Sequence, residues 1–385
     1  MKKIVLVLGV AALLFASCGS SPSSTNASKE PDLTGVTSYY VRANGNDRNT
    51  GISEDMPFKT LARAVTAALS TNVKKITVIG KLDGTTTIKN TVKPTLSAVV
   101  DRPVTETVVG GQKIVSVDMT KPAFAQIKGS YNEPDPNEIL ITGKPDASGN
   151  EKAVLTNSRN ADNILRIESA AVRLENIEVS GFASTNPDSR CIRVWTGVLI
   201  LGKDAKITSN KVIGVHAIDG GVIIMRDNAE VSNNQSDRGN TGVYLETGSV
   251  MVMLDNTVIK ENKALGYSGG GVAITAGTLI MRGNSAISNN SSANFGGGII
   301  VFDSDGLIEM YDNATVTGNN TAVSGGVLLF GVLRMNDTSK ITDNTASGNG
   351  GGVFVEGAAS IYKAATAVLA NNKAPRYPDT NFNLR

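Results

Sequence analysis

The chain repeats a ten-residue phrase, Met-x-x-Asn-x-x-(Ile/Val)-x-x-Asn, five times between Met225 and Asn344, with Thr338 in place of the first Asn in the fifth copy. A degenerate copy precedes these five and ends at Asn210, and a further copy follows them with Val368 and Asn371 in its last two positions. The closing Asn recurs every 24 to 29 residues. Self-similarity at such a period is typical of repeat architectures, in which each unit packs only against its neighbours. We therefore expect function on an extended surface and not in a single deep pocket.

The repeat unit predicts short strands and not helices. Asn, Gly and β-branched residues are poor helix formers, and the units have no apolar pattern of period 3.6. Apolar residues alternate instead, as in Leu279-Ile280-Met281, and a Gly-Val phrase such as Gly271-Val272-Ala273-Ile274 follows each closing Asn. Each unit thus offers a Gly-Val strand, a Met strand and an Ile/Val strand. Three strands per unit suit a parallel β-helix better than a propeller, whose blades need four antiparallel strands and a longer repeat.

Stacked coils place equivalent residues above one another at a spacing of about 4.8 Å, so we expect three columns. The first is an inward column of Met225, Met253, Met281, Met310 and Met335. The second is a column of Ile207, Val231, Ile259, Ile287, Val316 and Ile341. The third is a ladder of Asn210, Asn234, Asn262, Asn290, Asn319 and Asn344 at a bend. A buried amide is costly unless it is paired, and bonding from each Asn to the next would supply the pair.

The N-terminal region strengthens this interpretation. The stretch Tyr39–Asp47 followed by Pro57–Leu61 resembles the start of bacterial secreted proteins of the right-handed parallel β-helix, or pectate-lyase-like, superfamily. The resemblance implies a helix over residues 58–69 that caps the first coil. The apolar residues of that segment on one helical face are Phe58, Leu61, Val65 and Leu69. The predicted fold is all-β, a right-handed parallel β-helix with an N-terminal capping helix.

The repeats are also similar to those of polymorphic outer-membrane proteins and related adhesins. Those proteins usually continue into a membrane barrel, whereas 11 residues follow Ala374 here, so we expect no self-export. The predicted organisation is a signal peptide (1–17), a flexible tether (18–37), a cap with irregular first coils (38–160) containing an insertion (92–137), regular repeats (161–374) and a tail (375–385).

The first residues have the character of a secretory signal: Met-Lys-Lys, an apolar run over Ile4–Phe15, and small residues before Cys18. The stretch Leu14-Phe15-Ala16-Ser17-Cys18 resembles a bacterial lipobox, which implies lipidation of Cys18; the alternative is ordinary cleavage nearby and a free thiol. The apolar run is too short to span a bilayer comfortably. Lipidation would leave Cys191 as the only thiol and exclude an intrachain disulfide.

Charge narrows the classes of partner. The formal net charge is +2, and cleavage would remove Lys2 and Lys3, leaving 35 basic against 35 acidic residues. A neutral chain gives no indication of nucleic-acid binding. Arg226, Arg282 and Arg334 are spread among acidic residues, so we expect no basic patch.

Catalytic patterns are weak. The resemblance to the pectate-lyase-like superfamily implies lyase bases or clustered Asp with a nearby His, but the one histidine, His216, is not between glycines and is expected on the surface. Acidic residues near the end of the Met strand either bind a metal or, as we favour, turn the chain by bonding their own backbone. These residues are Asp204, Asp227, Asp255, Asp312 and Asp337. We expect no catalytic residue, no metal and no cofactor.

The middle residues of the Gly-Val strands are expected to point outward, and from Tyr244 onward they are apolar. Contiguous exposed apolar surface signals either a partner or a covering loop. We predict ligand contact along Tyr244, Ile300, Leu328 and Phe354. The favoured function is a lipid-anchored protein of the bacterial cell envelope, at the outer membrane or cell surface, that binds a polysaccharide or surface protein without catalysis. The alternatives are a polysaccharide lyase or glycoside hydrolase, and a purely structural envelope component.

Overall fold

The computed structural model describes residues 31–91, 94, 97–101, 104–109, 112–117, 124–128, 135–237, 239–266 and 268–382, with the backbone alone for the segments between 97 and 128. The predicted signal peptide and Cys18 lie outside these residues. The chain divides into two compact units, Met1–Thr34 and Gly35–Arg385.

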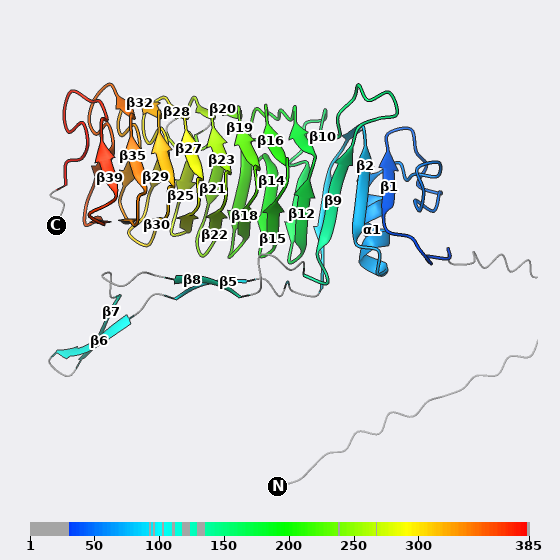
Figure 1. Cartoon of the computed structure of the whole chain (residues 1–385), viewed down its shortest axis with the longest axis horizontal. Coiled ribbons are helices and arrows are strands. Elements are labelled where there is room, and N and C mark those ends of the chain that lie inside the picture. Colours follow the sequence, from blue (N-terminus) through cyan, green and yellow to red (C-terminus); the bar gives the residue numbers. More distant parts are fainter. Residues whose placement is uncertain are drawn as a thin grey trace, which may run out of the picture. The chain divides into compact units, whose positions relative to one another are not determined.

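The second unit is a parallel β-solenoid, confirming the predicted fold (Figure 1). Its eleven-stranded sheet, here the Met sheet, contains β1 (Tyr39–Arg42), β2 (Lys75–Ile79), β9 (Ile139–Lys144), β12 (Ala171–Glu175), β15 (Val198–Leu201), β18 (Val222–Met225), β22 (Val250–Met253), β26 (Thr278–Met281), β30 (Leu307–Met310), β34 (Val332–Met335) and β38 (Ser360–Lys363).

The second sheet, here the Ile sheet, has ten strands: β3 (Lys81–Asp83), β10 (Val154–Thr156), β13 (Glu178–Ser180), β16 (Lys206–Thr208), β19 (Glu230–Ser232), β23 (Val258–Lys260), β27 (Ala286–Ser288), β31 (Thr315–Thr317), β35 (Lys340–Thr342) and β39 (Val368–Ala370). The third, here the Gly-Val sheet, has nine: β4 (Thr86–Lys89), β11 (Leu165–Glu168), β14 (Arg190–Trp195), β17 (Ile213–Ile218), β21 (Val243–Leu245), β25 (Val272–Ile274), β29 (Ile299–Val301), β33 (Val327–Leu329) and β37 (Val353–Val355).

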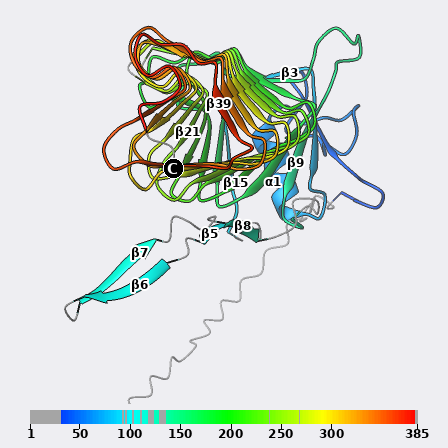
Figure 2. The same ribbon diagram turned by 60° about the vertical axis from the view of Figure 1, so that its left-hand side comes forward.

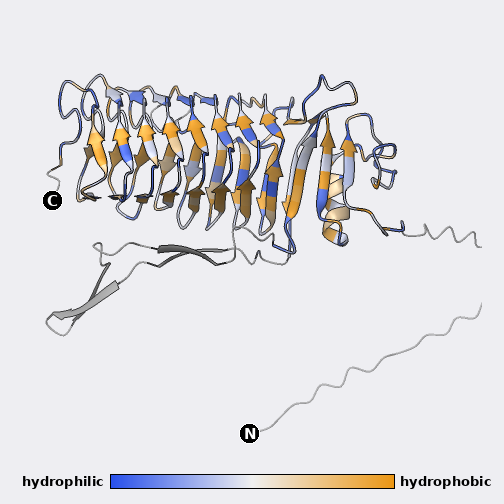
Figure 3. Cartoon of the chain, viewed as in Figure 1, coloured by the Kyte–Doolittle hydropathy of each residue, from blue (hydrophilic) through white to orange (hydrophobic). Residues whose placement is uncertain are grey.

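Coils from residue 235 onward contain a fourth strand that the sequence analysis did not predict. These two-residue strands form a five-stranded sheet: β20 (Gln235–Ser236), β24 (Lys263–Ala264), β28 (Ser291–Ser292), β32 (Asn320–Thr321) and β36 (Thr345–Ala346). Figure 2 shows the successive coils nearly end-on, with β39 at the near end. Hydrophobic residues dominate the strands and hydrophilic ones the connecting loops (Figure 3).

The predicted columns are present. Strand register aligns the five repeat methionines from Met225 to Met335, and each is fully buried. The Ile/Val column is equally continuous. The prediction for the last copy is wrong by one residue, because Ile341 pairs with Leu369 and not with Val368. Its ladder residue is accordingly Asn372 and not Asn371.

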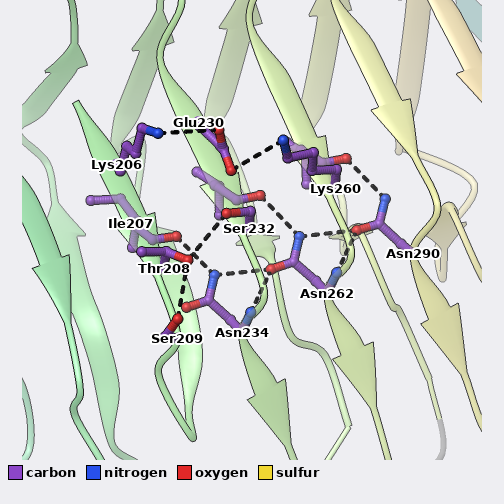
Figure 4. Close-up of polar contacts among 12 residues, drawn as sticks. Lys206, Ile207, Thr208, Ser209, Glu230, Ser232, Asn234, Lys260, Asn262 and Asn290 are labelled. Carbon is purple, nitrogen blue, oxygen red and sulfur yellow. Dashed lines mark hydrogen bonds and ion pairs between the residues drawn. The ribbon is translucent and has the colours of Figure 1, made fainter. Parts of the chain in front are cut away.

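The buried asparagines form an unbroken hydrogen-bonded ladder (Figure 4). The Nδ2 of Asn262 donates to the Oδ1 of Asn290 at 3.0 Å, and the same oxygen accepts from the backbone N–H of Asn262 at 3.0 Å. The second Nδ2 hydrogen of Asn262 reaches the carbonyl of Val231. Equivalent bonds join every rung from Asn210 to Asn372. The ladder thus satisfies amides that are fully buried.

The C-terminal tail completes this ladder. Backbone N–H groups of β37 donate to the tail, for example Val353 to the carbonyl of Asp379 at 2.8 Å. The side chain of Asp379 takes the position of a next rung, since its Oδ1 accepts from both the N–H and the Nδ2 of Asn372. The tail therefore pairs with the last coil at the Gly-Val sheet.

At the other end, α1 (Leu61–Ser70) contacts β1, β2, β4 and β9 and caps the first coil, as predicted. Its buried face contains Leu61, Ala64, Val65, Ala67 and Ala68. Phe58 is not helical but pairs with Val41. The preceding motif orients the helix, because the carboxylate of Asp47 accepts from the N–H groups of Lys59 and Thr60. Thr60 in turn caps the helix N-terminus.

The predicted insertion leaves the solenoid after β4 and returns at β9. Its described backbone contains two antiparallel pairs of strands. The first pair is β5 (Ser97–Asp101) with β8 (Phe124–Lys128), and the second is β6 (Val104–Val109) with β7 (Gln112–Val117). The predicted boundary at residue 160 does not interrupt the coils, because β10 pairs with both β3 and β13.

Candidate binding face

The nine strands of the Gly-Val sheet carry a row of outward-facing residues at their middle positions. Strand register places in this central row Thr87, Arg166, Arg193, His216, Tyr244, Ala273, Ile300, Leu328 and Phe354. The row is polar or charged at the N-terminal end and apolar after His216. Because the strands are in register, chemistry from distant parts of the sequence meets on one continuous face.

Two of the four predicted contact residues have little exposed surface. Ile300 and Leu328 are 2% and 5% exposed, while Tyr244 and Phe354 are half-buried. The bend before each strand folds back over the central row. At Gly296, which has a φ of +60°, a Cβ would lie 2.7 Å from the Cβ of Ile300. Only glycine tolerates that approach in that conformation, so the predicted contact surface is reduced to Tyr244 and Phe354.

Three arginines gather at the N-terminal end of the face. Arg166 and Arg193 are register neighbours, and Arg190 lies in the same strand as Arg193. The pattern of repeats does not extend to this region, so it did not indicate this grouping. Burial and the charge of Arg193 lower the pKa of Arg190. We call Arg166, Arg190 and Arg193 the arginine cluster.

Local partners satisfy the arginine cluster only in part. Arg190 donates to the carbonyls of Pro187 and Ser189, both at 2.9 Å, and Arg193 donates to the carbonyl of Asp188 at 2.7 Å. The Nε atoms of Arg190 and Arg193 are buried without a hydrogen-bond partner. Arg166 is ion-paired with Glu168, whose Oε1 lies 2.5 Å from the Arg166 Nε, whereas these hydrogen bonds of Arg190 and Arg193 go to neutral carbonyls. Neutral carbonyls do not offset positive charge, so Arg190 and Arg193 favour an anionic group at this site.

His216 lies beside the arginine cluster and is 3% exposed, so it is not the surface histidine that we expected. Its Nε2 lies 3.0 Å from the Oε1 of Glu246, and its ring stacks on Tyr244 with centroids 4.8 Å apart. Burial lowers the pKa of His216, outweighing the opposite effect of Glu246. The hydrogen bond from His216 lowers the pKa of Glu246. The pair is therefore a neutral imidazole held by a carboxylate.

A second outward row, two residues further along each strand, contains aromatic side chains that the sequence analysis missed. Trp195, Phe302 and Phe330 are 38%, 40% and 37% exposed, and we call them the aromatic row. Phe302 and Phe330 extend the parallel ladder by one residue beyond β29 and β33. The guanidinium of Arg166 lies 5.1 Å from the centre of the Trp195 ring, which joins this row to the arginine cluster. The sequence did contain a signal for the aromatic row, because Phe302 and Phe330 occupy the same position in successive repeats.

A polar cavity of about 200 Å³ adjoins the arginine cluster. Arg190 and Lys211 line it together with Asp237 and the loop at residues 184–189. This volume is below the ~300–1,000 Å³ of drug-sized sites, so it suits one small polar group of a larger ligand.

Sequence comparison agrees with this architecture. Residues 148–374 match the family described as "Right handed beta helix region". The chain belongs to the right-handed β-helix family. The matched residues include most of the β-helix, from the loop before β10 to the end of the last coil.

Among solved structures, the β-helix is similar to the GH136 lacto-N-biosidase from Eubacterium ramulus. The TM-score is 0.30 and the identity 9%, over 88% of this chain and 68% of that chain. No curated protein matches the sequence.

The acidic column beside the Met sheet has a structural role in the β-helix. Asp227, Asp255 and Asp312 have positive φ angles between 52° and 60° and turn the chain. The prediction that these carboxylates bond their own backbone is wrong for Asp255 and Asp312, which accept from a neighbouring coil. Asp255 accepts from the N–H of Asp227 at 2.8 Å, and Asp312 from the N–H of Gly283 at 2.9 Å. Within the described ranges, no group of three or more His, Cys, Asp or Glu residues is placed to hold a metal ion. No helix in those ranges is long and apolar enough to cross a membrane.

Proposed function

We propose that this chain is a lipid-anchored protein of the bacterial cell envelope whose β-helix binds an acidic glycan without cleaving it. The observation that carries the proposal is the arginine cluster directly beside exposed Trp195 on one sheet face. Guanidinium groups recognise carboxylate and sulfate with paired hydrogen bonds, and an indole ring packs on the flat face of a sugar.

The rest of the face suits an extended ligand. At about 4.8 Å per coil, Phe302 lies roughly 19 Å and Phe330 roughly 24 Å from Trp195 along the axis. A glycan lying parallel to the axis would place its acidic groups at the arginine cluster and later sugars on the aromatic row. Half-buried Tyr244 and Phe354 border this path. Tyr and Phe lose little conformational entropy on binding, which favours contact without a deep pocket.

Binding without cleavage is the favoured activity because of the state of His216. Its Nε2 is engaged by Glu246 and its ring is covered by Tyr244, so it is poorly placed to exchange a proton with a bound sugar. Enzymatic cleavage of a polysaccharide remains the competing function, and the binding experiment distinguishes the two.

The binding test uses polygalacturonate, chondroitin sulfate and neutral dextran in isothermal titration calorimetry at two salt concentrations. We expect both acidic polymers to bind, more weakly at high salt, and dextran to bind at least tenfold more weakly. Arg166→Gln with Arg193→Gln should weaken acidic-glycan binding at least tenfold.

The matched control removes two positive charges elsewhere, with Lys206→Gln and Lys260→Gln on the Ile sheet. These lysines flank Glu230 away from the face (Figure 4), so affinity should not change. Equal losses of affinity in both double variants would show that net charge alone causes the effect, and this result would overturn the proposed site. Release of unsaturated products or reducing ends from either polymer would establish the enzyme instead.

The anchor is tested separately. Wild-type protein expressed in a Gram-negative host with labelled palmitate should carry the label and partition into membranes. Cys18→Ser should lose both properties while the β-helix keeps its circular dichroism spectrum. Wild-type protein that carries no label and stays in the aqueous phase would refute lipidation, and the proposed glycan site would be unaffected by that result.

A further inference from the structure

The outer face of the Met sheet is mainly apolar from β12 to β34, apart from a buried ion pair between Glu309 and Arg334 at 2.8 Å. Alternate residues of each strand point away from the methionine column. The apolar outward residues are Ala171, Val198, Ile200, Val222, Ile224, Val250, Val252, Ile280, Leu307 and Val332. They form clusters that Leu254, Tyr311 and Tyr362 border. We call this surface the outer Met face.

The outer Met face is as buried as the interior. Its apolar residues are 1% to 6% exposed, with Val252 at 1% and Ile224 at 2%. The partly buried hydrophobic side chains packed against these clusters, among the described residues, are Leu254, Tyr311 and Tyr362 of the same coils. On the Gly-Val sheet the outward Ile300 is equally buried, but there the bend at Gly296 folds over it. Burial this deep on an outer sheet face indicates that a further layer lies on the Met sheet.

The insertion contains a segment with the complementary pattern. In the β5/β8 pair, Ala98 is opposite Ile127 and Val100 is opposite Ala125. Strand positions two apart share a side, so these four apolar positions share one side of the ribbon. The other side carries four polar positions and two apolar ones: Ser97, Asp101, Gln126, Lys128, Val99 and Phe124. A two-stranded ribbon is at best marginally stable in water unless it packs on another element.

Both ends of the insertion lie near the outer Met face. It leaves after β4 at the corner between the Gly-Val and Met sheets and returns at β9 of the Met sheet. At the return point, the carboxylate of Glu138 pairs with Arg173 at 2.6 Å. Arg173 is the register neighbour of Ile200 and so lies at the start of the apolar residues. Six residues separate β8 from Asp135 and span up to roughly 20 Å, enough to reach across about four coils.

We propose that the β5/β8 ribbon docks with its apolar side on the outer Met face and forms a permanent third layer of the solenoid. The occupant is this segment of the same chain, and not a second copy or a membrane surface. A ribbon that needs support and an apolar sheet face with almost no exposed surface together favour this occupant. This inference does not depend on the glycan proposal, since it concerns a different sheet.

Hydrogen exchange of the full-length protein tests the docking. We expect the amides of residues 97–101 and 124–128 to exchange at least tenfold more slowly than those of an isolated ribbon. Val252→Asp places a charge at the centre of the face and should abolish that protection. Ser288→Asp, at an outward position of the Ile sheet, is the matched control and should leave it intact. Protection that survives Val252→Asp, or that is absent in the wild type, would overturn the proposal.

If Val252→Asp does not fold, a deletion variant tests the docking independently. Residues 95–130 are replaced by a short Gly-Ser linker, and binding of the dye 1-anilinonaphthalene-8-sulfonate is measured with sedimentation. We expect a monomeric wild type with little dye binding and a deletion variant that binds severalfold more dye or self-associates. Unchanged dye binding in the deletion variant, or a wild-type dimer whose dissociation exposes the face, would show that the ribbon is not the occupant.

Discussion

Replacing Asn290 by Ala removes one rung from the middle of the buried ladder. Four side-chain hydrogen bonds disappear with it. Asn290 accepts from the N–H and the Nδ2 of Asn262, and donates to the carbonyl of Ile259 at 2.9 Å and to Asn319 at 3.1 Å. Because Asn290 is fully buried, water cannot replace these partners without opening the coil.

The expected decrease in the free energy of unfolding follows from the four hydrogen bonds that are lost. At about 1 kcal/mol per hydrogen bond, the lost bonds alone amount to about 4 kcal/mol, and donors left buried at Asn262 raise the total to about 4–6 kcal/mol. The same coil supplies a matched control. Asn284 is exposed and makes two similar inter-coil bonds, to Asn256 at 3.0 Å and from Asn313 at 3.3 Å. Since water can replace those bonds, Asn284→Ala should cost less than about 1 kcal/mol.

Urea unfolding monitored by circular dichroism measures both variants against the wild type. The midpoint should shift strongly for Asn290→Ala and barely for Asn284→Ala, with the dependence on urea unchanged. Equal shifts would show that the fold does not distinguish buried from exposed rungs. A loss below about 1.5 kcal/mol for Asn290→Ala would refute the reasoning directly.

Other perturbations test separate features. Met281→Ala should cost about 2–5 kcal/mol in the same titration, because a fully buried side chain leaves a cavity. Burial lowers the folded-state pKa of His216, so below about pH 6.5 the unfolded chain binds more protons than the folded one, and wild-type stability should fall as the pH falls. In thermal melts between pH 8 and 5, His216→Gln should lose this part of the pH dependence. Cys191 is buried and its thiol pKa is raised, so Ellman's reagent should label it only after unfolding, and rapid labelling of native protein would contradict the packing. Asp379→Ala should cost about 1.5–3 kcal/mol locally, seen as faster amide exchange in β39 than in β31.

The fold was predictable because the repeat fixes register. A methionine or asparagine at each period determines which residues stack, and the structure places both columns as predicted. The one misplaced rung shows the limit of the pattern. In the last copy Val368 and Leu369 are both apolar and Asn371 and Asn372 are identical, so periodicity alone could not choose between adjacent positions.

The candidate binding face was less predictable. Burial of Ile300 depends on a preceding bend that folds back over the strand, and alternation within the strand carries no information about that bend. The arginine cluster lies where repeats are irregular, so only the observed pairing of Arg166 with Arg193 brings it together. The outer Met face was missed because Val250-Met251-Val252-Met253 is apolar at every position, which conceals its second buried side.

The ladder of asparagines has a direction. Every Nδ2–H bond between rungs points toward the C-terminal coil and every accepting oxygen faces the N-terminal one, so the amide dipoles add along the axis as peptide dipoles do in a helix. The partial positive charge of this array accumulates at Asn372, where the carboxylate of Asp379 receives it. A carboxylate accepts but cannot donate, so it neutralises the end of the array and also leaves no hydrogen for another rung. The single acidic side chain of Asp379 thus matches the polarity of the ladder and ends it.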